Sequence, residues 1–140
     1  MATGRLPGVG PMPVIVAVDH DHREVNVVAI GPVTFEDALN QLKSEMRAGG
    51  LSYPKFVDAR GAGVLITPEE NFRIAQKIRA YSREIALGPV AFVVSSDAAC
   101  EAINVLAELV ENVCEMNVFR DESEARAWLD ARKRKQGAEA

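Results

Sequence analysis

The chain has 140 residues, of which 48% are hydrophobic and 26% charged, and its net charge is −4. This balance is typical of a single globular domain, and no apolar run approaches the ~20 residues that would cross a bilayer. The negative charge argues against a general affinity for nucleic acid or anionic lipid, because such binding depends on clustered Lys and Arg. The amino terminus lacks the basic and apolar regions of a signal peptide, so we expect a cytoplasmic protein.

The first predicted elements follow a segment rich in Gly and Pro, residues 1–11, which we expect to be a flexible arm. Residues 12–135 are predicted to form one domain, and residues 136–140 a disordered tail. Two β-branched runs, residues 13–18 and 24–30, flank the charged sequence "DHDHR". This pattern predicts two antiparallel strands joined by a polar turn.

Four predicted helices alternate with three further strands along the rest of the chain. The helices begin at residues whose side chains can cap a first turn, as Thr34 and Thr67 can with an acidic residue three positions later. The predicted helices span 34–48, 67–86, 96–115 and 121–135, and the strands span 55–59, 89–95 and 116–119. The order β-β-α-β-α-β-α-β-α predicts an α/β fold with a mixed five-stranded sheet. Its first strand is expected to be antiparallel, at an edge.

The predicted helix over 96–115 has an unusually wide apolar surface. Its apolar side chains include Val105, Ile103, Leu106, Leu109, Val110 and Val113. This width indicates heavy burial, partly against a partner, and a homodimer is therefore expected. Cys100 and Cys114 lie in the same predicted helix, ~21 Å apart along its axis, so we expect no disulfide and interpret both as small buried hydrophobic residues.

The sequence "DHDH", Asp19–His22, is the strongest candidate for a metal site, because His20 and His22 would lie on one side of an extended chain. These are the only two histidines, and polar residues are also what a hairpin turn requires. We interpret the sequence as a turn and predict no metal and no cofactor. With both histidines at the turn, a hydrolase would lack a base beside any Ser or Cys nucleophile. The basic run Arg132–Lys135 is interpreted as a solvated helix end.

Ligands of such sheets usually bind at the loops that follow the carboxyl ends of the strands. The segment "VDARGAGVLITPEEN", residues 57–71, reads as a strand, a glycine-containing loop and a helix start. Its glycines match only part of a dinucleotide-binding motif, since Ile66 occupies the third small position, so nucleotide binding is not expected. The candidate binding residues are Arg60, Gly61, Gly63, Thr67 and Glu70, with Ser95, Ser96 and Asp97 after the next strand. The Thr67 hydroxyl could be a structural cap or, where a helix terminus favours phosphate, a phosphorylation site.

These pieces together resemble the STAS fold of anti-sigma-factor antagonists, and more closely its SpoIIAA-like branch of small bacterial proteins. The resemblance rests on "AIGPVTFEDALNQL", "KFVDARGAGVLITPEE", "GPVAFVVSSDAACEAINVLAELV" and "NVFRDESEARAWL", and it covers about residues 13–130. Antagonist domains carry a phosphorylatable serine at the start of the helix after the third strand, and Thr67 matches its position. Ile66, Pro68 and Glu69 depart from the family's D-S-S-G-like motif around that serine.

The expected function is that of a non-catalytic regulatory or protein-binding module, with Arg60–Glu70 and Ser95–Asp97 as its binding surface. One alternative is a carrier of a small apolar ligand or lipid, since the branch is similar in fold to Sec14-type lipid-binding domains. That likeness implies an apolar cleft beneath the helices, involving Phe72, Ile103 and Leu106. The other alternative is an enzyme using Asp58, Arg60 or Glu70, which would require a carboxylate with a raised pKa.

Overall fold

The computed structural model describes residues 13–139, with side chains described through residue 135. The predicted flexible arm, residues 1–11, lies outside the described residues. The elements are β1 (Val14–Asp19), β2 (Glu24–Thr34), α1 (Phe35–Ala48), β3 (Lys55–Leu65), α2 (Pro68–Ser82), β4 (Val90–Val93), α3 (Asp97–Leu109), β5 (Met116–Phe119) and α4 (Glu122–Glu139). Their order is the predicted one. None of the helices in this part of the chain has the length and apolar character needed to cross a membrane.

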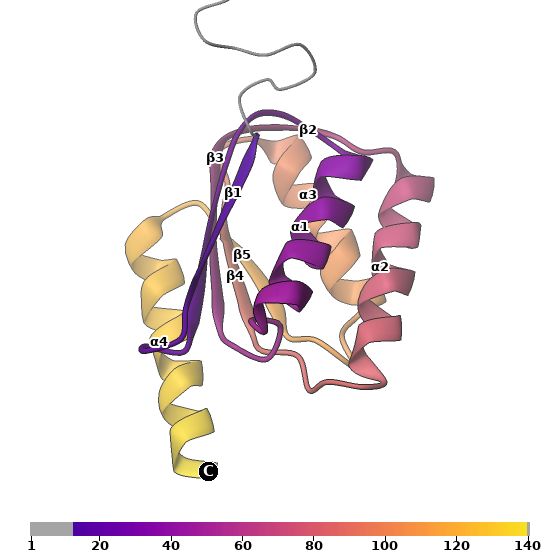
Figure 1. Cartoon of the computed structure of the whole chain (residues 1–140). Coiled ribbons are helices and arrows are strands. Elements are labelled where there is room, and N and C mark those ends of the chain that lie inside the picture. Colours follow the sequence, from indigo (N-terminus) through magenta and orange to yellow (C-terminus); the bar gives the residue numbers. More distant parts are fainter. Residues whose placement is uncertain (1–12, 140) are drawn as a thin grey trace, which may run out of the picture.

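The five strands form one sheet in the order β1-β2-β3-β4-β5. β1 pairs antiparallel with β2, and the other neighbours pair in parallel, so the predicted antiparallel edge strand is confirmed. Helices α1, α2 and α3 cover one face of the sheet, and α4 alone lies on the other (Figure 1). The protein is therefore a three-layer α/β structure with unequal cover on its two faces.

Two apolar clusters hold these layers together. The larger lies between the sheet and the three-helix layer and includes the fully buried Val25 and Val110. The smaller joins α4 to the sheet through Phe56, Ala125 and Leu129, and the last two are 0% exposed. Trp128 of the same helix is partly buried against this cluster.

Strands β2 and β3 extend well beyond their predicted ends. They continue together as a parallel two-stranded ribbon, in which Val33 lies opposite Val64 and Thr34 opposite Leu65. A register shift between Val28 and Ile30 separates this ribbon from the body of the sheet. The interpretation of Gly61 and Gly63 as loop residues is wrong, because both lie within β3. We interpreted the glycines as signs of a loop, but backbone pairing with β2 keeps both of them in an extended strand.

Helix α3 ends at Leu109, six residues before its predicted end. A turn follows, in which the N–H groups of Val113 and Cys114 both donate to the Val110 carbonyl. This turn keeps the apolar residues directed into the core, which explains why the helical periodicity continues past the helix. The placement of both cysteines in one helix is therefore wrong. Both are free, and Cys114 is buried beyond the end of α3.

Helix α4 continues to Glu139, so its backbone extends four residues past the predicted end of the domain. The basic run Arg132–Lys135 lies inside this helix and is only partly solvated. Arg132 bonds Glu115 at 2.9 Å, and Lys133 bonds Glu24 at 2.8 Å. Arg132 and Lys133 therefore attach α4 to the residue before β5 and to β2. The interpretation of the run as a solvated helix end is wrong for these two residues.

Candidate functional site

The carboxyl edge of the parallel sheet carries an ion-paired cluster beside α4. Asp58 lies opposite Val93, the last residue of β4. The Arg60 guanidinium donates two hydrogen bonds to the Asp58 carboxylate, from Nε at 3.0 Å and from Nη2 at 2.8 Å. It also donates one to Glu122 at the start of α4. Hydrogen bonding to Arg60 lowers the pKa of Asp58, and the same contacts raise the pKa of Arg60. The cluster links β3 to α4.

Thr67 and Glu70 form the predicted capping box at the start of α2. The Thr67 hydroxyl accepts a hydrogen bond from the Glu70 N–H at 3.1 Å, and the Glu70 carboxylate accepts one from the Thr67 N–H at 3.0 Å. Thr67 is exposed. A phosphate on its hydroxyl would meet the Glu70 carboxylate, and like charges repel at such distances. Phosphorylation of Thr67 stays a prediction.

The loop after β4 is tied to the end of β5. Ser96 caps α3 by accepting a hydrogen bond from the Ala99 N–H at 3.1 Å. Asp97 forms an ion pair with Arg120, and this contact raises the pKa of Arg120. Ser95 contributes its carbonyl to the same arginine at 3.5 Å. Arg120 could not be identified from the sequence, because its partner lies 23 positions away.

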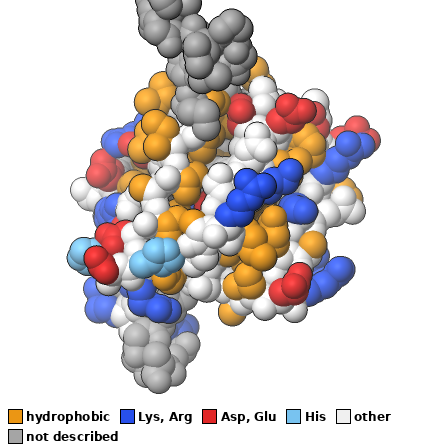
Figure 2. Space-filling model, in the orientation of Figure 1, with side chains coloured by type: hydrophobic (Ala, Val, Ile, Leu, Met, Phe, Trp, Pro, Cys, Tyr) orange, Lys and Arg blue, Asp and Glu red, His pale blue; other side chains and the backbone are white. Residues whose placement is uncertain are grey.

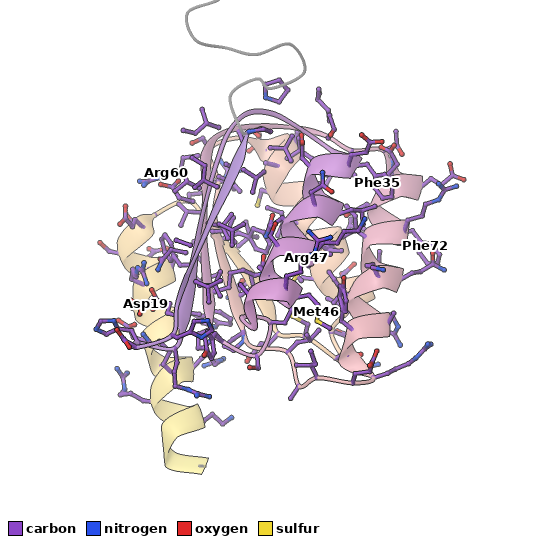
Figure 3. The ribbon with its side chains drawn as sticks, in the orientation of Figure 1. Asp19, Phe35, Met46, Arg47, Arg60 and Phe72 are labelled. Atoms are coloured by element: carbon purple, nitrogen blue, oxygen red, sulfur yellow. The ribbon has the colours of Figure 1, made fainter. Side chains whose placement is uncertain are left out.

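The structure divides the predicted binding residues between the two sides of the sheet. Arg60 lies on the side of α4, whereas α2, which Thr67 and Glu70 cap, belongs to the three-helix layer (Figure 3). Ser96 and Asp97 lie at the start of α3 in that same layer. Arg60 forms no hydrogen bond or ion pair with any of these residues; its partners are Asp58 and Glu122. The candidate set is therefore two surfaces rather than one.

Four exposed apolar side chains lie on the α4 side of the sheet, near Arg60. Ile15, Val28, Ile30 and Leu65 are 56%, 40%, 61% and 60% exposed. The strand registers put all four on one face. Ile15 pairs with Val28, and Ile30 lies two residues further along β2, so these three side chains point the same way. Leu65 of β3 pairs with a residue four positions after Ile30, and it therefore lies on that face too. We call this surface the open face. Helix α4 does not cover it, since it packs on β3, β4 and β5.

The two ribbon glycines belong to the open face and are not required by the backbone. Neither has a positive φ, unlike Gly31 and Gly49. A Cβ at Gly63 would meet nothing within 4 Å, and one at Gly61 would make only ordinary contacts with Ile30 and Ala29. The backbone of the ribbon is thus left bare on this side for a reason other than local conformation.

The "DHDH" sequence forms the turn between β1 and β2, and its histidines have separate partners. His20 bonds the Tyr53 hydroxyl at 2.7 Å, whereas His22 bonds Asp19 through both its ring and its backbone N–H. Those two bonds lower the pKa of Asp19. Among the described residues no three His, Cys, Asp or Glu side chains are grouped to hold a metal ion. The turn interpretation is confirmed.

Sequence reasoning missed a buried ion pair between α1 and β3. Glu45 is 0% exposed, and its carboxylate accepts hydrogen bonds from Lys55 at 2.6 Å and from Gln41 at 2.8 Å. Glu45 falls on the apolar face of α1 beside Leu42, which is a weak signal in the sequence. Lys55 is the first residue of β3, and a single lysine at a strand start does not indicate burial.

A second missed network attaches α4 to β2. Glu24 accepts hydrogen bonds from Arg126 and Lys133, and Asn26 accepts one from Arg126 at 2.8 Å. Burial would raise the pKa of Glu24, but these hydrogen bonds outweigh it and the pKa is lowered. Arg126 also lies 3.9 Å from the centre of the Phe56 ring. Partners about a hundred positions apart could not be paired from one sequence.

The space beneath the helices is a cavity of about 130 Å³, lined by residues that include Ile103 and Leu106. Phe72 does not line it and is 50% exposed, so its predicted place beneath the helices is wrong. Pockets for drug-sized ligands measure roughly 300–1,000 Å³. The cavity is too small for a lipid chain, so the structure does not favour the lipid-carrier alternative.

The wide apolar surface of the predicted third helix is largely used within the chain. Ile103, Leu106 and Val110 are buried, and Leu109 and Val113 pack partly buried against the same core. Only Val105, at 42%, stays exposed among the large apolar side chains of α3. The homodimer stays a prediction, but α3 gives it little support.

No family model matches the sequence, and no curated protein matches it either. A similar solved structure is an uncharacterised protein of the DUF3478 family from Shewanella loihica PV-4, described as having a SpoIIAA-like fold. It superimposes with a TM-score of 0.55, covering 83% of this chain and 93% of that one, at 16% sequence identity. This chain has a SpoIIAA-like fold.

The predicted SpoIIAA-like architecture is thereby confirmed. At this level of identity the similarity concerns the arrangement of strands and helices and does not extend to individual site residues. In this chain the open face and the Arg60 cluster lie on the same side of the sheet as α4.

Proposed function

We propose that this protein acts by binding another protein and catalyses no reaction, and that the open face receives the partner. The observation that carries the proposal is the exposure of Ile15, Val28, Ile30 and Leu65 on one face. Contiguous apolar areas of this kind are uncommon on isolated domains and often mark interaction sites. The bare backbone at Gly63 supports the proposal, because it lets a partner approach closely.

The electrostatics support binding in preference to proton transfer. Asp19, Glu24 and Asp58 all have lowered pKa values, caused by hydrogen bonds from His22, from the α4 cations and from Arg60. A carboxyl group that donates a proton near neutral pH needs the opposite shift. These three carboxylates are suited to holding the structure together.

The chemistry of the open face suggests a partner with an apolar contact surface and no required charge. Arg60, at its border, already pairs with Asp58 and Glu122. Complex formation should therefore depend little on salt, because screening acts on unpaired charges at the rim of an interface.

Site-specific photocrosslinking tests the proposal. A benzophenone amino acid at Ile30 should capture one protein in cells, whereas the same group at Gln76, exposed on α2, should not. The captured protein is then purified and its affinity measured for the wild type and for Gly63→Tyr, which fills the bare backbone without disturbing the fold. We expect at least tenfold weaker binding by Gly63→Tyr. Equal capture at both positions, or unchanged affinity, would contradict the proposal.

A further inference from the structure

Strand β1 is an edge strand without the usual protection. Its residues Val14–Val18 are all apolar, and they include no Lys, no Pro and no bulge. Natural edge strands normally carry such features, because an unprotected edge pairs with other chains. Among the described residues no strand lies on the outer side of β1.

The hydrogen-bond pattern identifies the backbone groups that are free for pairing. The Ile30 N–H donates to the Pro13 carbonyl at 2.8 Å, which makes these residues a hydrogen-bonded pair of the antiparallel ladder. Since the direction of the groups alternates along a strand, Val14, Val16 and Val18 direct their N–H and C=O groups outward. Three residues thus offer six backbone groups to an added strand.

A groove of about 660 Å³ runs along this edge, between β1 and α1. From α1 it is lined by side chains that recur at helical spacing: Asp37, Asn40, Gln41, Ser44 and Ala48. Figure 2 looks onto this side of the molecule, where hydrophobic side chains follow β1 and the two histidines lie at its lower end. The groove leaves room beside the edge for another strand.

We infer that the occupant of this groove is the β1 strand of a second copy, paired antiparallel across a twofold axis. Complementary polar and charged groups favour this occupant. Asp37 lines one end of the groove and His20 the other, so the twofold brings each carboxylate, a hydrogen-bond acceptor, to the partner copy's imidazole. α1 has Glu36 and Asp37 in its first turn and Arg47 in its last, so antiparallel α1 helices also attract.

The spacing of the elements permits this assembly. Helix α1 packs on both β1 and β2. With α1 above the gap between them, the twofold separates the two α1 axes by about two strand spacings, or roughly 10 Å, which is a normal distance between packed helices. The helix faces that would meet carry small or polar side chains, such as Asn40, Ser44 and Ala48. The two sheets would become one ten-stranded sheet.

Measurement of mass in solution by light scattering or sedimentation tests the inference. The wild type should have twice the mass of the chain, and Ser44→Trp, which fills the groove from α1, should be monomeric. Lys43→Trp is the matched control, since Lys43 is exposed on α1 outside the groove, and it should remain dimeric. Circular dichroism verifies that each variant is folded. A wild type that stays monomeric at its highest concentration overturns the inference, as does a dimeric Ser44→Trp.

Amide hydrogen exchange distinguishes strand pairing from any other dimer. The Val16 N–H should exchange slowly in the wild type and rapidly in Ser44→Trp. The N–H groups of Ile15 and Ala17 point to β2 and should exchange slowly in both proteins, which makes them an internal control. Rapid exchange at Val16 in a dimeric wild type would show that the copies meet elsewhere and would refute the β1 pairing.

Discussion

Removing one member of the buried Glu45–Lys55 pair should cost more stability than any surface change. The side chain of Glu45 is 1% exposed and that of Lys55 11%. Lys55→Met keeps most of the aliphatic stem, so the main effect is to leave the Glu45 carboxylate without its cation. Breaking such a pair costs about 3–5 kcal/mol, a large share of the ~5–15 kcal/mol that stabilises a typical domain. For a chain of this size the loss corresponds to a fall of roughly 6–20 °C in Tm.

Urea denaturation of four proteins provides the assay: the wild type, Lys55→Met, Glu45→Met and the double variant. Replacing both charges by apolar side chains is often neutral or stabilising, so the double variant should be at least as stable as the wild type. Lys43→Met on the exposed side of α1 is the control and should change the free energy of unfolding by less than ~0.5 kcal/mol. A loss below ~1 kcal/mol in Lys55→Met, or additive effects in the double variant, would refute the reasoning.

Three further changes probe the core and the caps. Leu129→Ala should lower the free energy of unfolding, measured by urea denaturation, by about 2–5 kcal/mol, because Leu129 is 0% exposed between α4 and the sheet. A smaller loss would mean that α4 is loosely packed. Thr67→Ala should lower the free energy of unfolding by ~1 kcal/mol, because alanine cannot cap α2, whereas Thr67→Asn keeps a capping side chain and should lower it much less. Equal losses in the two variants would exclude capping as the cause. Burial raises the pKa of the Cys114 thiol to about 11, so it should resist alkylation in the native state, and stability should fall as pH rises above the unfolded thiol's value of ~8.5; rapid native labelling would contradict this.

The order of elements could be predicted because local signals agreed with one another. Thr34 and Thr67 each form the capping box that their sequences indicated. The polar turn between the first two strands is closed by Asp19, whose side chain bonds the backbone of His22. Each of these signals acts over three or four residues, and one sequence reveals such interactions.

The errors arose where distant residues decide the structure. Gly61 and Gly63 weaken a strand in isolation, but pairing with Ile30 and Pro32 of β2 keeps β3 extended through them. The end of α3 was hidden because its turn preserves the apolar spacing. Arg60 was predicted as a binding residue, but its main partner across the fold, Glu122, lies 62 positions away. The division of the candidate site between two sides of the sheet follows from the same limitation.

The open face and the free edge have a common origin in the chain topology. The three crossovers from β2 to β5 each advance one strand in the same direction, and right-handed connections of this kind place α1, α2 and α3 on the same face. The other face can receive only the helix at the end of the chain, α4, which packs on β3, β4 and β5. β1 joins by a hairpin and brings no helix of its own. Topology thus leaves β1 and the part of β2 around Ile30 uncovered on the α4 side of the sheet. It does not, however, require the apolar residues Ile15 and Ile30 at these positions. Polar residues would satisfy the fold equally well, so the apolar choice at these two positions is the strongest argument that another protein surface covers them.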